Sequence, residues 1–230
     1  IVNSGPAPYT GLTMTDDLGA YTYGTGTLTP LTYVDGSLRY FVNGVLQATP
    51  TPTADAPLTV PGIAVPAGGN ALLIYETRVN SFAPLDTEST VTNTATLSGA
   101  GLTTPVQAAS TVNARAAAYL TIGKAVSPAT VAENGTLTYT FTIQNYGNTA
   151  AAETDNVTVS DTFSPILKAI SVTYNGAAWT EGTQYTYNAA TGAFATTAGQ
   201  ITVPAASLTR DAATGAVVVT PGISTLTVTG

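Results

Sequence analysis

The sequence contains no cysteine and no histidine, and only 8% of its 230 residues are charged. Without cysteine there are no disulfides and no thiol nucleophiles, and without histidine no Ser-His-Asp triad can form. The common zinc and haem ligands are absent for the same reason. These absences exclude most familiar enzyme chemistry, so we expect a protein that is not an enzyme and that has no metal or cofactor.

Positive charge is scarce as well: six Lys and Arg residues stand against 13 Asp and Glu residues, for a net charge of −7. Nucleic acid is bound through clustered positive charge, so no nucleic-acid partner is expected. No run of about 18 apolar residues predicts a membrane-spanning helix. No secretory or sorting signal is seen, and the sequence starts within what reads as a strand, so we expect a window of a longer polypeptide.

Alternation of apolar residues with threonine is the main pattern that the sequence does contain. Residues 136–143 read Thr-Leu-Thr-Tyr-Thr-Phe-Thr-Ile, which places the apolar side chains on one face of a strand and the threonines on the other. The pattern recurs at residues 90–97, 157–160 and 226–228. The Asn-Gly pairs at 43–44 and 175–176 predict hairpin turns, because both central residues of such turns need positive φ. The sequence therefore predicts an all-β fold built from β-sandwich domains.

Two incomplete copies of one repeat follow each other with a period on the order of 140 residues. The matched segments are residues 1–5 and 143–147, 12–16 and 157–161, 43–44 and 175–176, and 58–61 and 201–204. We predict two tandem Ig-like β-sandwich domains, residues 1–116 and 117–230. The first is expected to lack its first strands and the second its last strands. Open sheet edges need partners, so adjoining sequence or a neighbouring subunit is expected to complete each domain.

Short motifs follow one another in a fixed order across the two copies. They comprise residues 120–128 (Leu-Thr-Ile-Gly-Lys-Ala-Val-Ser-Pro), 134–139, 145–147 and 157–162 of the second copy, with residues 91–96 of the first. In these motifs the chain resembles the bacterial surface conserved repeat domain family, also called domain of unknown function eleven. The resemblance implies tandem Ig-like sandwiches in long cell-surface or secreted proteins, and it implies no catalytic residues. Two departures are the truncation of each copy and an extra loop around residues 210–211.

Four polar residues, namely Lys124, Asp161, Asp16 and Asn93, lie where the alternation places the core. Buried polar groups need partners, so we predict that Lys124 faces Asp161 inside the second domain. Asp16 and Asn93 are predicted to occupy the equivalent places of the first.

Lys, Asp and Asn are also the reactants of the intramolecular isopeptide cross-links of Gram-positive surface sandwiches. In those proteins a lysine on the first strand attacks an asparagine amide on the last strand, assisted by an acid. Burial favours the neutral amine and the protonated acid that this reaction uses. The alternative is a buried Lys124–Asp161 ion pair, in which case replacing Lys124 by Ala costs about 3–5 kcal/mol. On either interpretation, the 230 residues do not contain a complete set of lysine, asparagine and assisting acid within one domain.

Two groups of carboxylates raise other possibilities. Glu153, Asp155 and Asp161 could suggest calcium, but they fit no EF-hand loop, and a solvated loop is the better interpretation. Asp86 and Glu88 are expected to share a strand face, as a glycosidase pair could, but such a pair also needs a cleft. We therefore expect neither a metal site nor an active site at these residues.

Tyrosine pairs at residues 21 and 23 and at 185 and 187 each share one strand face. An exposed pair would form a stacking platform for sugars, whereas core or inter-domain packing is the favoured interpretation. The predicted function is a non-enzymatic extracellular structural protein, whose tandem sandwiches form a stalk, a filament or a surface-layer element. Its expected partners are neighbouring repeats or subunits of the same protein. The alternatives are an adhesin or carbohydrate-binding module, and a hydrolase that acts through Asp86 or Glu88.

Overall fold

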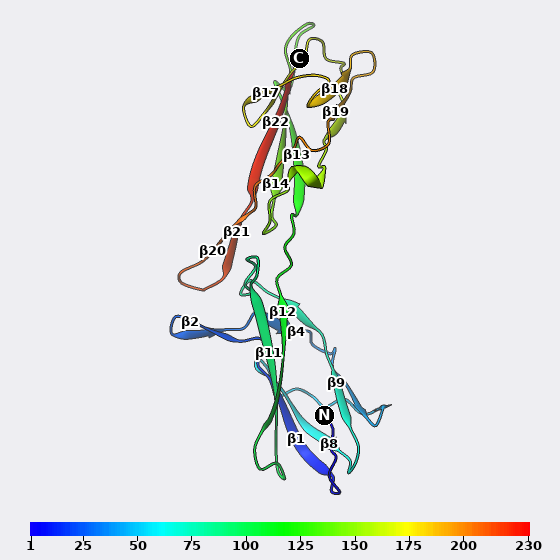
Figure 1. Cartoon of the computed structure of the whole chain (residues 1–230), viewed down its shortest axis with the longest axis vertical. Helices are drawn as coiled ribbons and strands as arrows, with labels where there is room; N and C mark the ends of the chain where they lie inside the picture. Colours follow the sequence, from blue (N-terminus) through cyan, green and yellow to red (C-terminus); the bar gives the residue numbers. More distant parts are fainter. The chain divides into compact units, whose positions relative to one another are not determined.

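The computed structural model describes residues 1–230, and its regular elements are strands except for one short 3-10 helix. The chain forms two compact units (Figure 1). Unit 1 comprises Ile1–Ala114 and Arg210–Val218, and unit 2 comprises Arg115–Thr209 and Val219–Gly230. The all-β prediction is confirmed.

The segment Arg210–Val218 differs from the predicted division, which placed it in the second domain. Its hydrogen bonds explain the difference. The Arg210 guanidinium donates to the Tyr21 hydroxyl at 2.6 Å, and the Val217 N–H donates to the Ser81 carbonyl at 2.7 Å. The segment is therefore held by residues of unit 1.

Unit 1 contains two main sheets and two short strand pairs. Its five-stranded sheet has the order β12-β11-β1-β8-β7, its three-stranded sheet has the order β6-β5-β9, and β2-β3 and β10-β4 form the pairs. The strands are β1 (Tyr9–Asp16), β2 (Tyr21–Tyr23), β3 (Gly26–Leu28), β4 (Leu31–Tyr33), β5 (Arg39–Val42), β6 (Val45–Leu46), β7 (Ala54–Asp55), β8 (Leu58–Val65), β9 (Ala71–Ile74), β10 (Thr77–Val79), β11 (Thr90–Ser98) and β12 (Val106–Asn113).

Unit 2 also contains one five-stranded and one three-stranded sheet, in the orders β13-β14-β22-β16-β17 and β15-β19-β18. Strands β20 and β21 form a separate pair, of which Arg210, Val217 and Val218 are counted with unit 1. The elements are β13 (Leu120–Ser127), β14 (Thr138–Asn145), η1 (Glu153–Asp155), β15 (Ser160–Thr162), β16 (Ser171–Tyr174), β17 (Ala177–Trp179), β18 (Tyr185–Asn188), β19 (Ala193–Thr196), β20 (Ser207–Arg210), β21 (Val217–Thr220) and β22 (Gly222–Thr229).

Side-chain alternation builds the core of each unit between its two main sheets. In β14 the apolar residues Tyr139, Phe141 and Ile143 are buried, while the intervening threonines are only partly buried. In β8 the alternation is interrupted between Val60 and Ile63, where the pairing with β1 shifts register at a bulge. Both strands therefore direct apolar side chains toward the facing sheet, as the sequence pattern predicts.

The two Asn-Gly turns have the predicted backbone conformation. Asn43 and Gly44 have φ of 48° and 80°, and Asn175 and Gly176 have φ of 49° and 82°. These turns join β5 to β6 and β16 to β17, which are antiparallel pairs. The two hairpins therefore join corresponding pairs of strands, β5–β6 and β16–β17.

Asn3 and Asn145 occupy equivalent buried positions. The side-chain amide of Asn3 donates to the Pro66 carbonyl at 2.9 Å, and that of Asn145 donates to the Pro204 carbonyl at 3.0 Å. In both cases the side-chain oxygen accepts the N–H of the residue two positions further on, at 2.9 Å. Each asparagine thereby fixes a turn and joins it to a distant segment.

Tyr40 and Tyr174 refine the repeat alignment in the same way. The Tyr40 hydroxyl donates to the Ala64 carbonyl at 2.8 Å, and the Tyr174 hydroxyl donates to the Thr202 carbonyl at 2.5 Å. Together with the asparagine contacts, this matches residues 63–66 to residues 201–204. The predicted match of residues 58–61 to 201–204 was therefore wrong: both segments have the pattern apolar-Thr-Val-Pro, but their structural partners differ.

Each unit has two strands in its main sheets that have no counterpart in the other unit. Strands β1, β8 and β7 of unit 1 correspond to β15, β19 and β18 of unit 2, but only unit 1 adds β11 and β12. Strands β9, β5 and β6 correspond to β22, β16 and β17, but only unit 2 adds β14 and β13. In unit 1, Ile1 and Ala71 exchange two backbone hydrogen bonds of 2.9 Å. This pair corresponds to the pair of Ile143 and Ser224 in unit 2.

Candidate functional site

Lys124 and Asp161 form an ion pair that joins the two main sheets of unit 2. Lys124 lies on β13, opposite Phe141 of β14, and Asp161 lies on β15 in the other sheet. The ammonium Nζ contacts Asp161 Oδ2. The other carboxylate oxygen, Oδ1, accepts the N–H of Thr162 at 2.8 Å. The structure therefore brings together the two residues that the sequence predicts to face each other.

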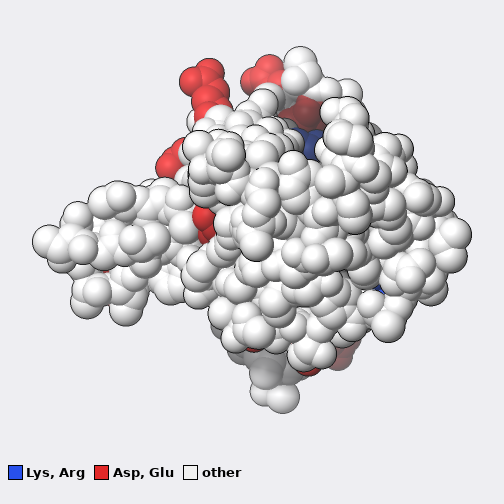
Figure 2. Space-filling model, turned by 90° about the horizontal axis from the view of Figure 1, so that it is seen from below, with Lys and Arg blue, Asp and Glu red and all other residues white.

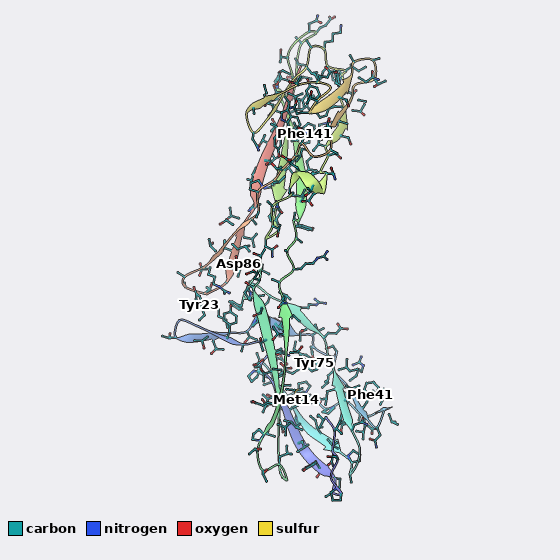
Figure 3. All side chains as sticks on the ribbon, in the orientation of Figure 1. Met14, Tyr23, Phe41, Tyr75, Asp86 and Phe141 are labelled. Atoms are coloured by element: carbon teal, nitrogen blue, oxygen red, sulfur yellow. The ribbon has the colours of Figure 1, made fainter.

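Three aromatic rings surround the ammonium of Lys124. Its Nζ lies 4.8 Å from the ring centre of Tyr139 and 5.7 Å from the ring centres of both Phe141 and Phe163. Phe141 is labelled on β14 in Figure 3. A cation near aromatic faces is attracted by the ring quadrupole, and aromatic rings also exclude water from one side of the amine. The rings thus hold the ammonium over Asp161.

The ion pair is less buried than the sequence predicts. The side chain of Lys124 is 42% exposed and that of Asp161 is 18% exposed, so Lys124 does not lie within a closed core. The reason is the absence in unit 2 of counterparts to β11 and β12, which cover the equivalent aspartate in unit 1. Asp161 Oδ2 is itself buried, and the ammonium of Lys124 is its contact.

Asp16 is the equivalent carboxylate of unit 1, and it is almost completely buried, with 1% exposure. Its Oδ1 accepts the Leu18 N–H at 2.7 Å. Its Oδ2 accepts the side-chain amide of Asn93 at 2.9 Å and also the hydroxyl of Tyr75, which is labelled in Figure 3. Burial and the hydrogen bond to Asp16 raise the pKa of Tyr75.

Asn93 is held at both ends of its side-chain amide. The nitrogen donates to Asp16 Oδ2, and the oxygen accepts the Gly19 N–H at 3.0 Å. The strand register explains this position, because Ala95 of β11 lies opposite Asp16 of β1. Asn93 therefore bonds both the predicted carboxylate and the backbone.

The pairing of the strands shows that the two aspartates are equivalent. Asp16 lies opposite Leu58 of β8, and Asp161 lies opposite Phe194 of β19. Each unit supplies one partner from a strand that the other unit lacks: Lys124 from β13 in unit 2, and Asn93 from β11 in unit 1. The structure thus pairs lysine with aspartate and aspartate with asparagine, but not lysine with asparagine.

Tyr75 is the one member of this site that the sequence analysis did not identify. It lies just beyond β9, at two-residue spacing from Ala71 and Leu73, both of which contribute to the core of unit 1. That spacing would have placed Tyr75 on the inner face. Its partner could not have been found in this way, because Asp16 is 59 residues away in the chain.

The acidic residues considered as alternatives do not form a site. Glu153 and Asp155 lie on η1, where Asp155 accepts the N–H of Ala152 at 2.8 Å, and no group of three or more His, Cys, Asp or Glu side chains could hold a metal ion. Asp86 and Glu88 lie in the loop before β11, and Glu88 has φ of 72°. The prediction that they share a strand face was therefore wrong, because the chain turns between them.

The tyrosine pairs are occupied by contacts within the protein. Tyr185 belongs to the core of unit 2, and the Tyr187 hydroxyl donates to the Leu167 carbonyl at 2.8 Å. In unit 1, the Arg210 guanidinium lies 5.3 Å and 5.5 Å from the ring centres of Tyr21 and Tyr23. These contacts favour packing over a sugar-stacking platform for both pairs.

The surface is poor in charge. Figure 2 shows a face that is mostly uncharged, with scattered Asp and Glu and very little Lys or Arg. The chain has no helix that is long and apolar enough to cross a membrane.

Comparisons of the chain with family models, with curated proteins and with solved structures found no match.

Proposed function

We propose that this chain belongs to a non-enzymatic structural protein outside the cell, in which tandem Ig-like β-sandwich units act as spacers in a stalk, filament or surface layer. We further propose that a complete unit is closed by an amide bond between a lysine in the place of Lys124 and an asparagine in the place of Asn93. The main support for this proposal is that Lys124 and Asn93 contact equivalent aspartates. Lys124 contacts Asp161 in unit 2, and Asn93 contacts Asp16 in unit 1.

The geometry supports the bond because the two contacts converge on one carboxylate. In a unit that had both β13 and β11, the ammonium and the carboxamide would both lie against the same aspartate. The aspartate would then hold the two reacting groups side by side, which lowers the entropic cost of their reaction. A unit of this kind would also bury the lysine, since β11 and β12 cover the face that is open in unit 2.

The reaction exchanges one amide for another. The carboxylate accepts a proton from the ammonium, and the neutral amine attacks Cγ of the asparagine. A bond from Nζ to Cγ forms, and the bond from Cγ to the carboxamide nitrogen breaks. That nitrogen takes up the one proton that the attacking amine loses and leaves as ammonia, while the carboxyl group keeps the proton that it accepted from the ammonium. No oxidant, metal or cofactor takes part.

Such a bond suits a protein that bears tension. Within a complete unit, the strand in the place of β13 comes first in the chain and the strands in the places of β11 and β12 come last. A covalent link between first and last strands would carry a pulling force past the core, so that the hydrogen bonds of the sheets would not bear it. The threonine-rich outer faces keep such units solvated with few charges.

The direct test is the mass of a chain that contains one complete unit. The pairs Ile1–Ala71 and Ile143–Ser224 make Gly230 equivalent to Thr77, so residues 78–114 repeated after Gly230 would complete unit 2. We expect the intact mass of this extended chain to be about 17 Da below the calculated value, because ammonia is lost. The unextended chain is expected at its calculated mass.

Two matched variants control this experiment. The only lysines of the chain are Lys124 and Lys168. Lys124→Ala should restore the calculated mass of the extended chain, whereas Lys168→Ala should leave the loss of ammonia unchanged. An extended chain that folds cooperatively but keeps its calculated mass would contradict the cross-link.

The location is tested separately. Immunogold electron microscopy with antibodies against residues 1–230 is expected to label the cell surface or extracellular filaments of the source cells. Label confined to the cell interior would contradict the extracellular structural role.

A further inference from the structure

We propose that β12 is a pairing edge, at which two copies of this chain join the five-stranded sheets of their first units into one continuous sheet. The two β12 strands run antiparallel about a two-fold axis that passes beside Ser110. The inference rests on the proposed function for one point only, that copies of the protein lie side by side. It goes further, because it names the surface through which they associate.

One edge of β12 has no neighbouring strand. β12 is the outermost strand of its sheet and pairs with β11 alone, and all of its residues, Val106–Asn113, are exposed. The N–H of Ala114, the residue after β12, donates to the carbonyl of Ser89, the residue before β11, at 2.7 Å. Backbone groups of successive residues in a strand point to opposite edges. The residues whose N–H and C=O groups point away from β11 are therefore Gln107, Ala109, Thr111 and Asn113.

The other outermost strands of the main sheets are shorter or carry a charge. β13 also has eight residues, but it directs Lys124 to the inner side, and an inward charge on an edge strand opposes further pairing. The remaining outermost strands have four residues or fewer. β12 contains no charged residue, proline or glycine, and its register with β11 is continuous. It therefore lacks the features by which edge strands avoid one another.

The sequence of β12 fits a second copy of itself. With Ser110 at the axis, Ala109 of each copy lies opposite Thr111 of the other, and Gln107 lies opposite Asn113. Antiparallel pairing at these positions gives roughly eight backbone hydrogen bonds. The chain carries a net charge of −7, which opposes contact between copies, but β12 itself is uncharged. No like charges therefore face each other across the new pair.

The inner side of β12 adds apolar contact. Asn93 of β11 points inward to its aspartate and lies opposite Ser110, so Ser110 and its alternate neighbours share the inner side. Val112 on that side is 60% exposed. In the paired sheet, Val112 of each copy lies opposite Ala108 of the other. Pairing thus brings exposed apolar side chains of both copies together.

Completion of unit 1 would leave this edge free. The strands that unit 1 lacks are the counterparts of β13 and β14, and in unit 2 these belong to the other main sheet, where β14 pairs with β22. The pairing edge and the proposed amide bond therefore use different surfaces.

The first experiment introduces one cysteine into the full chain, which has none. In Ser110→Cys the two thiols face each other at the axis, at a non-hydrogen-bonded position where the Cα atoms come within disulfide reach. Oxidised glutathione, which takes up the two electrons and two protons, is expected to give a disulfide-linked dimer on a non-reducing gel. Gln107→Cys is the matched control, because Gln107 faces Asn113 of the other copy. It should form dimer at least about tenfold more slowly.

The second experiment measures the reversible dimer of the full chain by analytical ultracentrifugation over a series of concentrations. Ala109→Pro removes an N–H that points away from β11, so it should weaken the dimer at least about tenfold without loss of a bond to β11. Ala109→Ser keeps that N–H and should dimerise as the parent does. Ser110→Lys places two ammonium groups at the axis and should weaken the dimer as Ala109→Pro does. Far-UV circular dichroism verifies the fold of each variant.

Three results would overturn the inference. They are a parent chain that stays monomeric at every concentration, equal rates of disulfide formation for Ser110→Cys and Gln107→Cys, and a dimer that persists in both folded variants, Ala109→Pro and Ser110→Lys. None of them bears on the amide bond, whose test is the mass of the extended chain. A monomer whose extended form loses ammonia would refute the pairing edge alone, and a paired dimer whose extended form keeps its calculated mass would refute the bond alone.

Discussion

Units 1 and 2 place equivalent aspartates in different surroundings. Asp16 is 1% exposed and accepts hydrogen bonds from Leu18, Tyr75 and Asn93. Asp161 is 18% exposed and faces a half-exposed lysine. The local sequences around the two residues are alike, so the difference comes from the strands that flank them. In this fold, the burial of a polar group depends on strands from the opposite end of the repeat.

The parts that both units share are built alike. Asn3 and Asn145 join the same turn to the same distant segment, and Tyr40 and Tyr174 bond equivalent carbonyl oxygens. These contacts join segments that are present in both units, namely residues 3–5 and 63–66 in unit 1 and residues 145–147 and 201–204 in unit 2. The comparison therefore separates two contributions to the free energy of unfolding. One comes from contacts that both units contain, and the other comes from contacts to strands that only one unit contains.

The largest effect is expected for Asp16→Ala. The substitution removes the acceptor of three hydrogen bonds in a buried place, so we expect the free energy of unfolding of unit 1 to fall by about 3–5 kcal/mol. The matched change, Asp161→Ala, should cost unit 2 about 1 kcal/mol, because that ion pair is partly solvated. Urea unfolding followed by far-UV circular dichroism, with Trp179 fluorescence to report unit 2, measures both. Equal costs would contradict the comparison.

Asn145→Ala and Asn3→Ala should have similar effects on their own units. Each variant leaves a buried turn N–H and carbonyl oxygens without partners, which predicts a loss of about 2–3 kcal/mol. The same unfolding experiment measures the two losses. A much smaller loss for one of them would show that the shared contacts are not energetically equivalent.

Tyr75→Phe is expected to cost unit 1 about 1–2 kcal/mol at neutral pH, since the hydroxyl would no longer donate to Asp16. The effect should depend on pH. Burial, followed by the contact with Asp16, raises the pKa of Tyr75 above its ordinary value of 10.0. Above pH 10 the unfolded chain therefore releases this proton while the folded chain keeps it.

The contribution of Tyr75 is thus fully present below pH 10, and it declines as the pH rises toward the folded-state pKa. The expected slope is about 1.4 kcal/mol per pH unit. Urea unfolding of the parent chain and of Tyr75→Phe at several pH values should show their difference shrinking above pH 10. A difference that stays constant to high pH would refute this assignment.

The smallest effect is expected for Lys124→Ala in the chain of 230 residues, about 0.5–1 kcal/mol, because the ammonium is partly exposed to water. The sequence analysis, which assumed a closed core, predicts about 3–5 kcal/mol for the same change. Trp179 fluorescence during urea unfolding distinguishes the two values. A large loss would show that the ion pair is effectively desolvated without further strands.

The sequence was sufficient for features that depend on local spacing. Alternating residues in β14 and the two Asn-Gly turns were enough to predict strands and hairpins, because strand period and turn conformation are set by neighbouring residues. The lysine and the aspartates were identified because they interrupt apolar faces. The pairing of Lys124 with Asp161 was predicted because buried polar groups need partners.

Other features depend on contacts that spacing does not encode. The exposure of Lys124 follows from the absence of flanking strands in unit 2, and the placement of residues 210–218 in unit 1 follows from hydrogen bonds to Tyr21 and Ser81. Residues 58–61 were matched wrongly because residues 58–61 and residues 63–66 both resemble residues 201–204. Only the hydrogen bonds of Tyr174 and Asn145 decide between the two.

The central claim is that β13 of unit 2 and β11 of unit 1 represent the two halves of one closed site. It is tested most directly by a crystal structure of the extended chain, residues 1–230 followed by residues 78–114. We predict that the added strands pair with β15 and that continuous density joins Nζ of Lys124 to Cγ of the added asparagine, beside Asp161. Added strands that pack elsewhere, with Lys124 still open to solvent, would contradict the account.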